Sequence, residues 1–235
     1  MSRTLAFTRE QLRAPFALVL LVAVPALFVV AAAGTLHDFA RPLGGSLAGS
    51  AAVGLSAGWA AAFLSGALGF FEAVSSRGAD RRLALAGVGP FHVAASRIAA
   101  SIALGSIAAA AGFVALELRS EVAHPWHAAA AVLAFAWMYV GIGVLVGSLV
   151  SGPLEGSLIV VFIFILDVFS GPGMSGSAAP WAISRKAADV LIAAGLGRGS
   201  PTADWAGLGP TTTAVLAAAF CVFVLRGRAD WLTSL

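Results

Sequence analysis

Charged residues are scarce in this chain of 235 residues, at 11% of the sequence. An average soluble domain carries about 25%. Hydrophobic residues make up 60% of the chain, so there are too few charges to cover a soluble surface of ordinary composition. The composition therefore excludes an ordinary soluble domain and predicts an integral membrane protein, with residues 1–235 forming a single transmembrane domain.

Lysine and cysteine are almost absent. Lys186 is the only lysine, and it follows Ser184 and Arg185 without a glycine-rich approach. A P-loop needs the pattern G-x-x-x-x-G-K-[ST], whose backbone amides and lysine hold phosphates, so we expect no ATP site and no bound cofactor in this chain. The single cysteine, Cys221, lies in an apolar run and excludes both a disulfide framework and a cysteine metal site. We expect no metal ligands and no catalytic residues.

The net charge of +3 does not indicate a nucleic-acid partner. Nucleic-acid binding requires basic residues gathered on one face, whereas the arginines here are spread along the segments between apolar stretches. They are better explained as signals of membrane topology. Abundant alanine, and arginine in place of lysine, is typical of a high-GC bacterial genome, which favours a bacterial inner membrane as the location.

Six apolar stretches are long enough, or nearly so, to cross a bilayer, which takes about 20 residues. They lie near residues 16–34, 50–71, 93–116, 127–150, 156–171 and 208–225. The sequence thus predicts an all-α, polytopic protein with six transmembrane helices and with both termini in the cytoplasm. A seventh span is the alternative, but it would move the C-terminal arginines outside and weaken the charge bias.

Charges concentrate between the second and third spans, from Glu72 to Arg97. Because Arg77, Arg81 and Arg82 lie here, the positive-inside tendency places this loop in the cytoplasm. A compact cytoplasmic loop between two spans is where a membrane protein can receive force from a soluble partner. The alternative is that these arginines only enforce topology and meet anionic lipid headgroups.

Two further segments lie outside the six spans. Residues 1–15 place apolar and charged side chains on different sides at helical spacing, which predicts an N-terminal interfacial helix. Residues 172–207 form an external segment that contains a short apolar piece, Ala187–Leu196. This piece is too short to cross, so we expect short interfacial or re-entrant helices between the fifth and sixth spans.

Asp167 is a carboxylate inside the fifth span. It lies 11 residues after Gly156, roughly 16 Å along a helix at about 1.5 Å per residue, which is near the middle of a bilayer. The sequence Gly171–Gly173 then breaks the helix. A carboxylate at that depth is costly unless it is protonated, paired or hydrated, so Asp167 should face the protein interior or a wet cavity. Two roles remain open, namely a residue of the translocation pathway and a hydrogen-bonded brace.

In the loop, Glu72 is followed by Arg77 with Gly78, and then by Leu83, Leu85 and Pro90. In kind and order these residues resemble the corresponding loop in permease subunits of type-2 ATP-binding-cassette exporters. The region from Gly147 to Phe169, followed by the glycine-proline-glycine break, is similar to the fourth and fifth spans of the family, and of its actinobacterial members in particular. Together with the six-span plan, the likeness covers essentially the whole chain.

The resemblance implies the membrane-spanning permease subunit of an ATP-driven exporter that moves a hydrophobic or amphipathic substrate out of the cell. In such exporters two permease copies assemble with two ATPase subunits, which bind ATP and Mg and carry out hydrolysis. Residues 73–90 would be the coupling loop that docks into the ATPase. The residues implied in coupling are Glu72, Arg77, Arg81, Arg82, Leu83, Leu85 and Pro90.

Two other classes of function compete with this expectation. The first is a structural or regulatory integral membrane protein without a transport cycle. The second is an intramembrane enzyme, because Gly173-Met174-Ser175-Gly176 resembles the serine motif of rhomboid proteases. A serine nucleophile needs a base within reach, and no histidine follows His127, so we do not expect an enzyme.

Overall fold

A computed structural model describes residues 15–40, 42, 45, 49–172, 174, 179–196 and 201–232. These residues form eight α-helices and no β-strand. The helices are α2 (Pro15–Ala40), α3 (Gly49–Ser75), α4 (Arg77–Leu85), α5 (Pro90–Arg119), α6 (Pro125–Leu149), α7 (Pro153–Ser170), α8 (Arg185–Leu196) and α9 (Pro201–Leu232). The expected all-α class is confirmed. The expected interfacial helix, residues 1–15, lies almost entirely outside the described residues.

Prolines mark where several helices begin. Pro90, Pro125 and Pro153 each occupy the first turn of a helix. Proline suits this position because its fixed φ is helical and its missing N–H would have no partner there. These prolines therefore mark where a connecting segment ends and the next long helix begins.

Five described helices are long and apolar enough to cross a membrane, which indicates a multi-pass membrane protein. They are Ala51–Ser75, Pro90–Arg119, Pro125–Leu149, Pro153–Ser170 and Trp205–Arg228. The first expected span, 16–34, falls within α2, where the described apolar stretch is the shorter piece Val19–Ala31. The structure thus supports five of the six expected spans by length and composition.

Helices α3 and α6 form the centre of the bundle, and glycines let them approach closely. A methyl group at Gly69 would lie 2.6 Å from the Val140 carbonyl oxygen, and one at Gly143 would overlap the Gly66 carbonyl oxygen. Small residues at such positions allow backbone-to-backbone packing in membranes, where association depends on close van der Waals contact. Any larger side chain at these glycines would push the two central helices apart.

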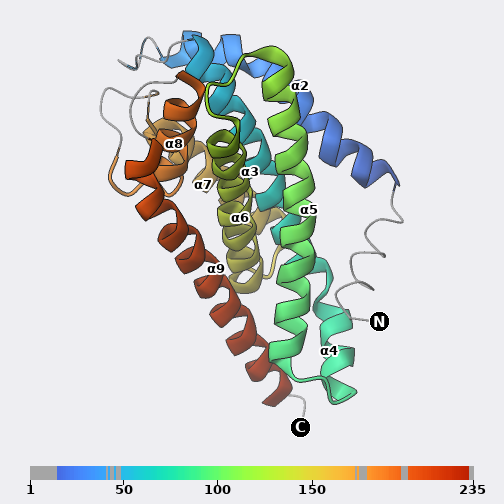
Figure 1. The fold of residues 1–235 in the computed structure, drawn as a ribbon. Coiled ribbons are helices and arrows are strands. Elements are labelled where there is room, and N and C mark those ends of the chain that lie inside the picture. The colour runs from blue at the N-terminus through green and yellow to red at the C-terminus, as the bar shows by residue number, and fades with distance from the viewer. Residues whose placement is uncertain are drawn as a thin grey trace.

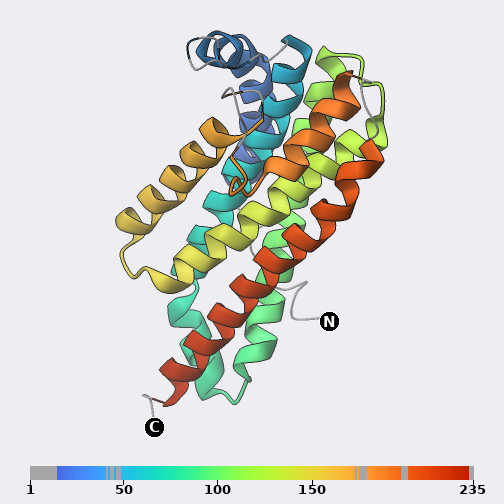
Figure 2. The same cartoon turned by 90° about the vertical axis from the view of Figure 1, so that its left-hand side faces the viewer.

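The bundle is elongated, with α4 at one end (Figure 1). The start of α5 and the end of α9 lie at this same end, where a methyl group at Gly227 would be 3.2 Å from Pro90. Helices α7 and α9 lie on opposite sides of α6 (Figure 2). The α4 end is therefore built from three helices, and it gathers the arginines of the segment between α3 and α5 with those at the end of α9.

The expected external segment, 172–207, contains one short helix in its described part, namely α8. One face of α8 is buried against α3, α6 and α9, through Ala187, Val190, Leu191 and other residues. Helix α9 already begins at Pro201, before the expected start of the sixth span near 208. The apolar piece seen in the sequence is thus a helix that packs on the bundle.

Candidate functional site

The short helix α4 is joined to the bundle by two tight turns. Ser76 alone separates α4 from α3, and residues 86–89 connect it to α5. In the second turn Gly87 has a φ of 82°, a left-handed conformation that glycine adopts without steric cost. The chain therefore leaves the bundle at Ser75, makes a helix of nine residues and returns at Pro90.

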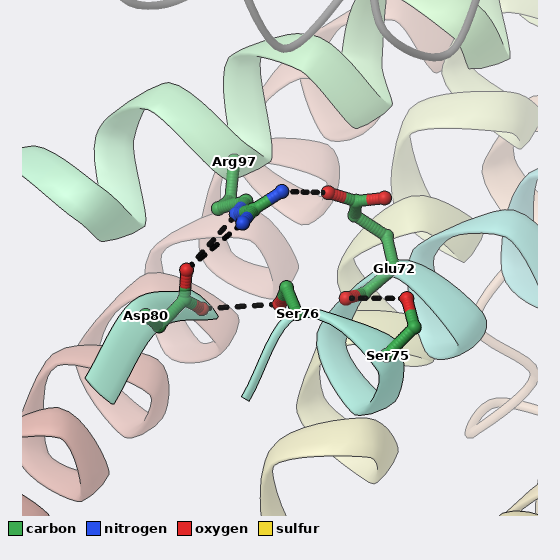
Figure 3. Close-up of polar contacts among 5 residues, drawn as sticks. All are labelled: Glu72, Ser75, Ser76, Asp80 and Arg97. Carbon is green, nitrogen blue, oxygen red and sulfur yellow. Dashed lines mark hydrogen bonds and ion pairs between the residues drawn. The ribbon is translucent and has the colours of Figure 1, made fainter. Parts of the chain in front are cut away.

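Arg97 of α5 lies at the centre of a buried polar cluster beneath α4 (Figure 3). Its Nη1 atom is 2.6 Å from Oε1 of Glu72, on α3. Its Nε and Nη2 atoms donate to Oδ1 of Asp80, on α4, at 3.1 and 3.0 Å. The side chains of Arg97 and Glu72 are only 10% and 8% exposed, so neither charge could be left unpaired cheaply. One arginine thus ties together α3, α4 and α5.

Asp80 is itself held in place by the turn before it. The Ser76 hydroxyl donates to Oδ2 of Asp80 at 3.0 Å (Figure 3). The Asp80 backbone amide donates to the Ser76 carbonyl oxygen at 2.8 Å. A carboxylate in the first turn of a helix also interacts favourably with the helix dipole. Both carboxylate oxygens of Asp80 are therefore in use, which fixes the start of α4.

A second arginine connects α4 to the end of α6. Arg77 donates to the carbonyl oxygens of Gly147, at 2.6 Å, and Ser151, at 3.0 Å, and also to that of Val150. The last carbonyls of a helix have no hydrogen-bond donor within the helix, and they carry partial negative charge. A guanidinium group supplies both the donors and a compensating positive charge. Arg226 of α9 donates to the Ser148 carbonyl at the same helix end. Helix α6 is thus capped from α4 and from α9.

The outer side of α4 is different, because Arg81 and Arg82 are both exposed. Leu83 is half-buried, and the side chain of Leu85 lies outside what the structure describes. Pro90 is half-buried at the first turn of α5. Of the seven residues expected to couple to an ATPase, Arg81 and Arg82 thus present charge to the surroundings.

Glu72 and Arg77, from the same set of expected residues, bind within the chain. Glu72 pairs with Arg97, and Arg77 caps α6. Their geometry gives them a positioning role, in which they hold α4 against the bundle. Four of the seven expected residues therefore fall into two groups, with Glu72 and Arg77 bound within the chain and Arg81 and Arg82 exposed.

Sequence reasoning did not select Asp80 and Arg97 as site residues. The signal for Arg97 was nevertheless present, because it falls inside the expected third span, 93–116. An ionisable residue within a span requires a partner, and Glu72 at the end of the preceding span was a carboxylate that could supply one. No comparable signal marked Asp80, whose role depends on the turn at Ser76.

Asp167 is buried, at 3% exposure, and makes polar contacts with two other elements. It accepts a hydrogen bond from the Tyr139 hydroxyl of α6 at 2.7 Å. It also accepts from the backbone N–H of Ser184, just before α8, at 3.2 Å. Asp167 lies three residues before α7 ends at Ser170, so it is nearer the end of its helix than the expected middle. The helix does end at the expected break, with Gly171 as its C-cap.

The contacts of Asp167 connect α7, α6 and the segment entering α8. A buried carboxylate that accepts from two donors is a brace by geometry, because each bond restrains a different element. The proposed role in a translocation pathway stays a prediction. In comparisons with protein-family models, curated proteins and solved structures, nothing matched this chain significantly, so a functional proposal depends on the residues described above.

Proposed function

We propose that this chain is the membrane-spanning subunit of an ATP-driven exporter, and that α4 is the surface on which a soluble ATPase subunit docks. The observation that supports the proposal is that some residues of α4 attach the helix to the bundle while others are exposed. Arg77 and Asp80 fasten the helix to the bundle, while Arg81 and Arg82 are exposed. A helix that transmits force needs both properties, a rigid attachment and a surface for the partner.

Helix α4 is attached to the bundle through both Arg77 and Asp80. Nine residues form only a marginal helix in isolation, because nucleation is costly and few hydrogen bonds repay it. The contacts of α4 to Arg97 and to the end of α6 therefore stabilise it. A push on α4 would act on α3 and α5 through Arg97, and on α6 through Arg77. Movement of the docked ATPase would thus reach the centre of the bundle.

The charge distribution favours a cytoplasmic location for α4. The exposed or carbonyl-bound arginines at this end of the bundle are Arg77, Arg81, Arg82, Arg226 and Arg228. The positive-inside tendency places such an end in the cytoplasm, where a soluble ATPase would be available. With α2 as the first of six spans, both termini would be cytoplasmic and the protein would reside in a bacterial inner membrane.

The remaining parts of the exporter would come from other chains. ATP and Mg would bind to the ATPase subunit, since the only lysine here lacks a P-loop. Helices α7 and α9 are the least buried of the five spans and would face lipid or a second permease copy. The exported substrate would be hydrophobic or amphipathic, as the family resemblance implies.

Charge reversal on α4 tests the proposal. The double variant Arg81→Glu, Arg82→Glu should insert and fold normally, because neither side chain is buried, yet it should no longer co-purify with an ATPase subunit from its native host in mild detergent. Arg228→Glu is the control, since Arg228 is an exposed arginine that follows Gly227, the residue beside Pro90 at the same end of the bundle. If the wild-type chain brings down no ATPase at all, a regulatory or structural role becomes the better explanation.

A further inference from the structure

A cavity of about 400 Å³ lies between α2, α3 and α7. Trp59 of α3 and Met174 line its inner end and are buried. Phe28 of α2 and Phe164 of α7 also line it and are half-buried. The volume falls within the range of about 300–1,000 Å³ that is typical of ligand sites. The cavity is therefore large enough to hold part of another molecule.

The cavity opens on the side of the bundle. Helices α2 and α7 each pack against α3, but within the described residues they do not pack against each other. The lining residues Ala31 and Thr35 of α2 are exposed, and so are Ile165 and Phe169 of α7. The cavity thus has a mouth between α2 and α7.

The mouth continues an exposed apolar stripe along α7. Leu158, Phe162, Ile165 and Phe169 follow one another at intervals of three or four residues and are 61%, 60%, 44% and 42% exposed. Residues at these intervals share one face of a helix. Because α7 is one of the five candidate spans, such a stripe of large apolar side chains faces the hydrocarbon of the bilayer. The molecules next to the mouth are therefore lipid acyl chains.

The lining determines which kind of molecule fits inside. No charged side chain lines the cavity in the described part of the chain, so an ionic group inside it would be left without compensation. Thr35 carries the one hydroxyl of the lining, whereas a buried water needs about two to four polar partners. An empty cavity would forfeit van der Waals contacts along its walls. Hydrocarbon suits this lining best, because it restores those contacts and needs no hydrogen bond.

We propose that the cavity binds one acyl chain of a membrane phospholipid, which enters between α2 and α7 and keeps its headgroup at the membrane face beside the end of α7. Helix α7 begins at the α4 end of the bundle, where Arg77 donates to the Ser151 carbonyl, so Ser170 lies toward the opposite membrane face. Phe169 is next to that face, and Phe164 lies about 7 Å deeper along α7, at about 1.5 Å per residue. The chain thus runs from Phe169 inward past Phe164. The site goes beyond the docking proposal, since it is built from α2, α3, α7 and the residues that follow α7.

A phosphatidylcholine that carries a diazirine on one acyl chain tests the site, in vesicles of dioleoyl phosphatidylcholine that contain the purified full chain. Ultraviolet light converts the diazirine to a carbene that inserts into nearby side chains, and mass spectrometry locates the adducts. Adducts should form on the half-buried Phe28 and Phe164 of the lining, as well as on the exposed Phe162 outside it. A lack of adducts on Phe28 and Phe164, as expected if a second copy of the chain covered the mouth, would overturn the site.

The position of the diazirine tests the direction of the bound chain. A diazirine near the ester should favour Phe169, and one near the methyl end of the acyl chain should favour Phe164, because Phe164 lies deeper in the membrane. The reverse order would contradict the proposed place of the headgroup.

Filling the mouth supplies the control. Ala31→Phe places a ring at the mouth and should abolish the adducts on the two lining phenylalanines while leaving those on Phe162. The adjacent Val30→Phe adds the same ring at an exposed residue outside the lining and should change neither. Thr35→Phe is a second filling variant if Ala31→Phe fails to insert. Lining adducts that persist after filling would show that lipid touches these residues without entering the cavity, which would overturn the proposal. The assay needs no ATPase, so its outcome is separate from the docking proposal.

Discussion

Arg97 on α5 pairs with Glu72 on α3 across 2.6 Å, with both side chains almost entirely buried. The second partner of Arg97, Asp80, belongs to α4, so the guanidinium joins the two long helices to the short one between them. Separating a buried ion pair is costly, because charges taken out of water depend on their partners for compensation. The ion pair is therefore the structural basis for treating α4 as a rigid extension of the bundle.

Removing Arg97 should destabilise the protein strongly. Arg97→Met removes the guanidinium that joins the buried Glu72 to Asp80, and breaking a buried ion pair costs about 3–5 kcal/mol. The measurement is the free energy of unfolding in mixed micelles titrated with SDS. Arg228→Met is the control, because an exposed arginine should change stability by no more than about 0.5 kcal/mol. Equal stability of the two variants would refute the role given to Arg97.

The brace at Asp167 predicts coupling between two residues. Tyr139→Phe removes a donor to Asp167 and should cost about 1–3 kcal/mol, since a buried carboxylate loses a hydrogen bond. Adding Asp167→Asn should cost less than the sum of the single changes, by at least about 0.5 kcal/mol. The same unfolding titration gives the three values. Strict additivity would contradict the brace.

If Asp167 belongs to a translocation pathway, Asp167→Asn should lower export per folded complex while leaving assembly normal. A brace predicts less folded protein but unchanged export per folded complex, because the side chain would not touch the substrate. Substrate efflux normalised to assembled protein separates the two roles. Normal assembly with lost efflux would show that Asp167 belongs to the translocation pathway.

The helical class and several helix boundaries could be predicted because they depend on local patterns. Long apolar runs indicate spans directly, and the helix break expected at Gly171 coincides with the end of α7, although α7 begins at Pro153, three residues before the expected start of the span. The piece Ala187–Leu196 was also visible, but its packing on the bundle was not. Hydropathy reports how apolar a helix is and cannot tell whether lipid or another helix covers it.

The candidate site was predictable only in part, because its contacts join distant residues. Sequence indicated α4 through its cluster of arginines, but it could not distinguish Arg77, which caps α6, from Arg82, which is exposed. That difference depends on where α6 ends, some seventy residues later.

Cysteine labelling tests the orientation of the bundle. In a Cys221→Ala background, which removes the only native cysteine, Ser75→Cys should react with a membrane-impermeant maleimide only after the cells are opened. Ala123→Cys, in the exposed turn between α5 and α6, should react in intact cells. The expectation follows from the arginines gathered at the α4 end. The reverse pattern would place α4 outside the cell and exclude docking of a cytoplasmic ATPase.

The most direct test of the account is a photo-crosslink from α4 in living cells. A photoreactive amino acid at position 82 should form an adduct with a second polypeptide, which mass spectrometry should identify as carrying a P-loop, because Arg82 is exposed on the helix that we propose as the docking surface. The same group at position 121, an exposed site at the opposite end of α5, should give no such adduct. An ATPase adduct from position 82 alone is the predicted result. No ATPase adduct from position 82, or equal adducts from both positions, would contradict the claim that α4 receives the ATPase.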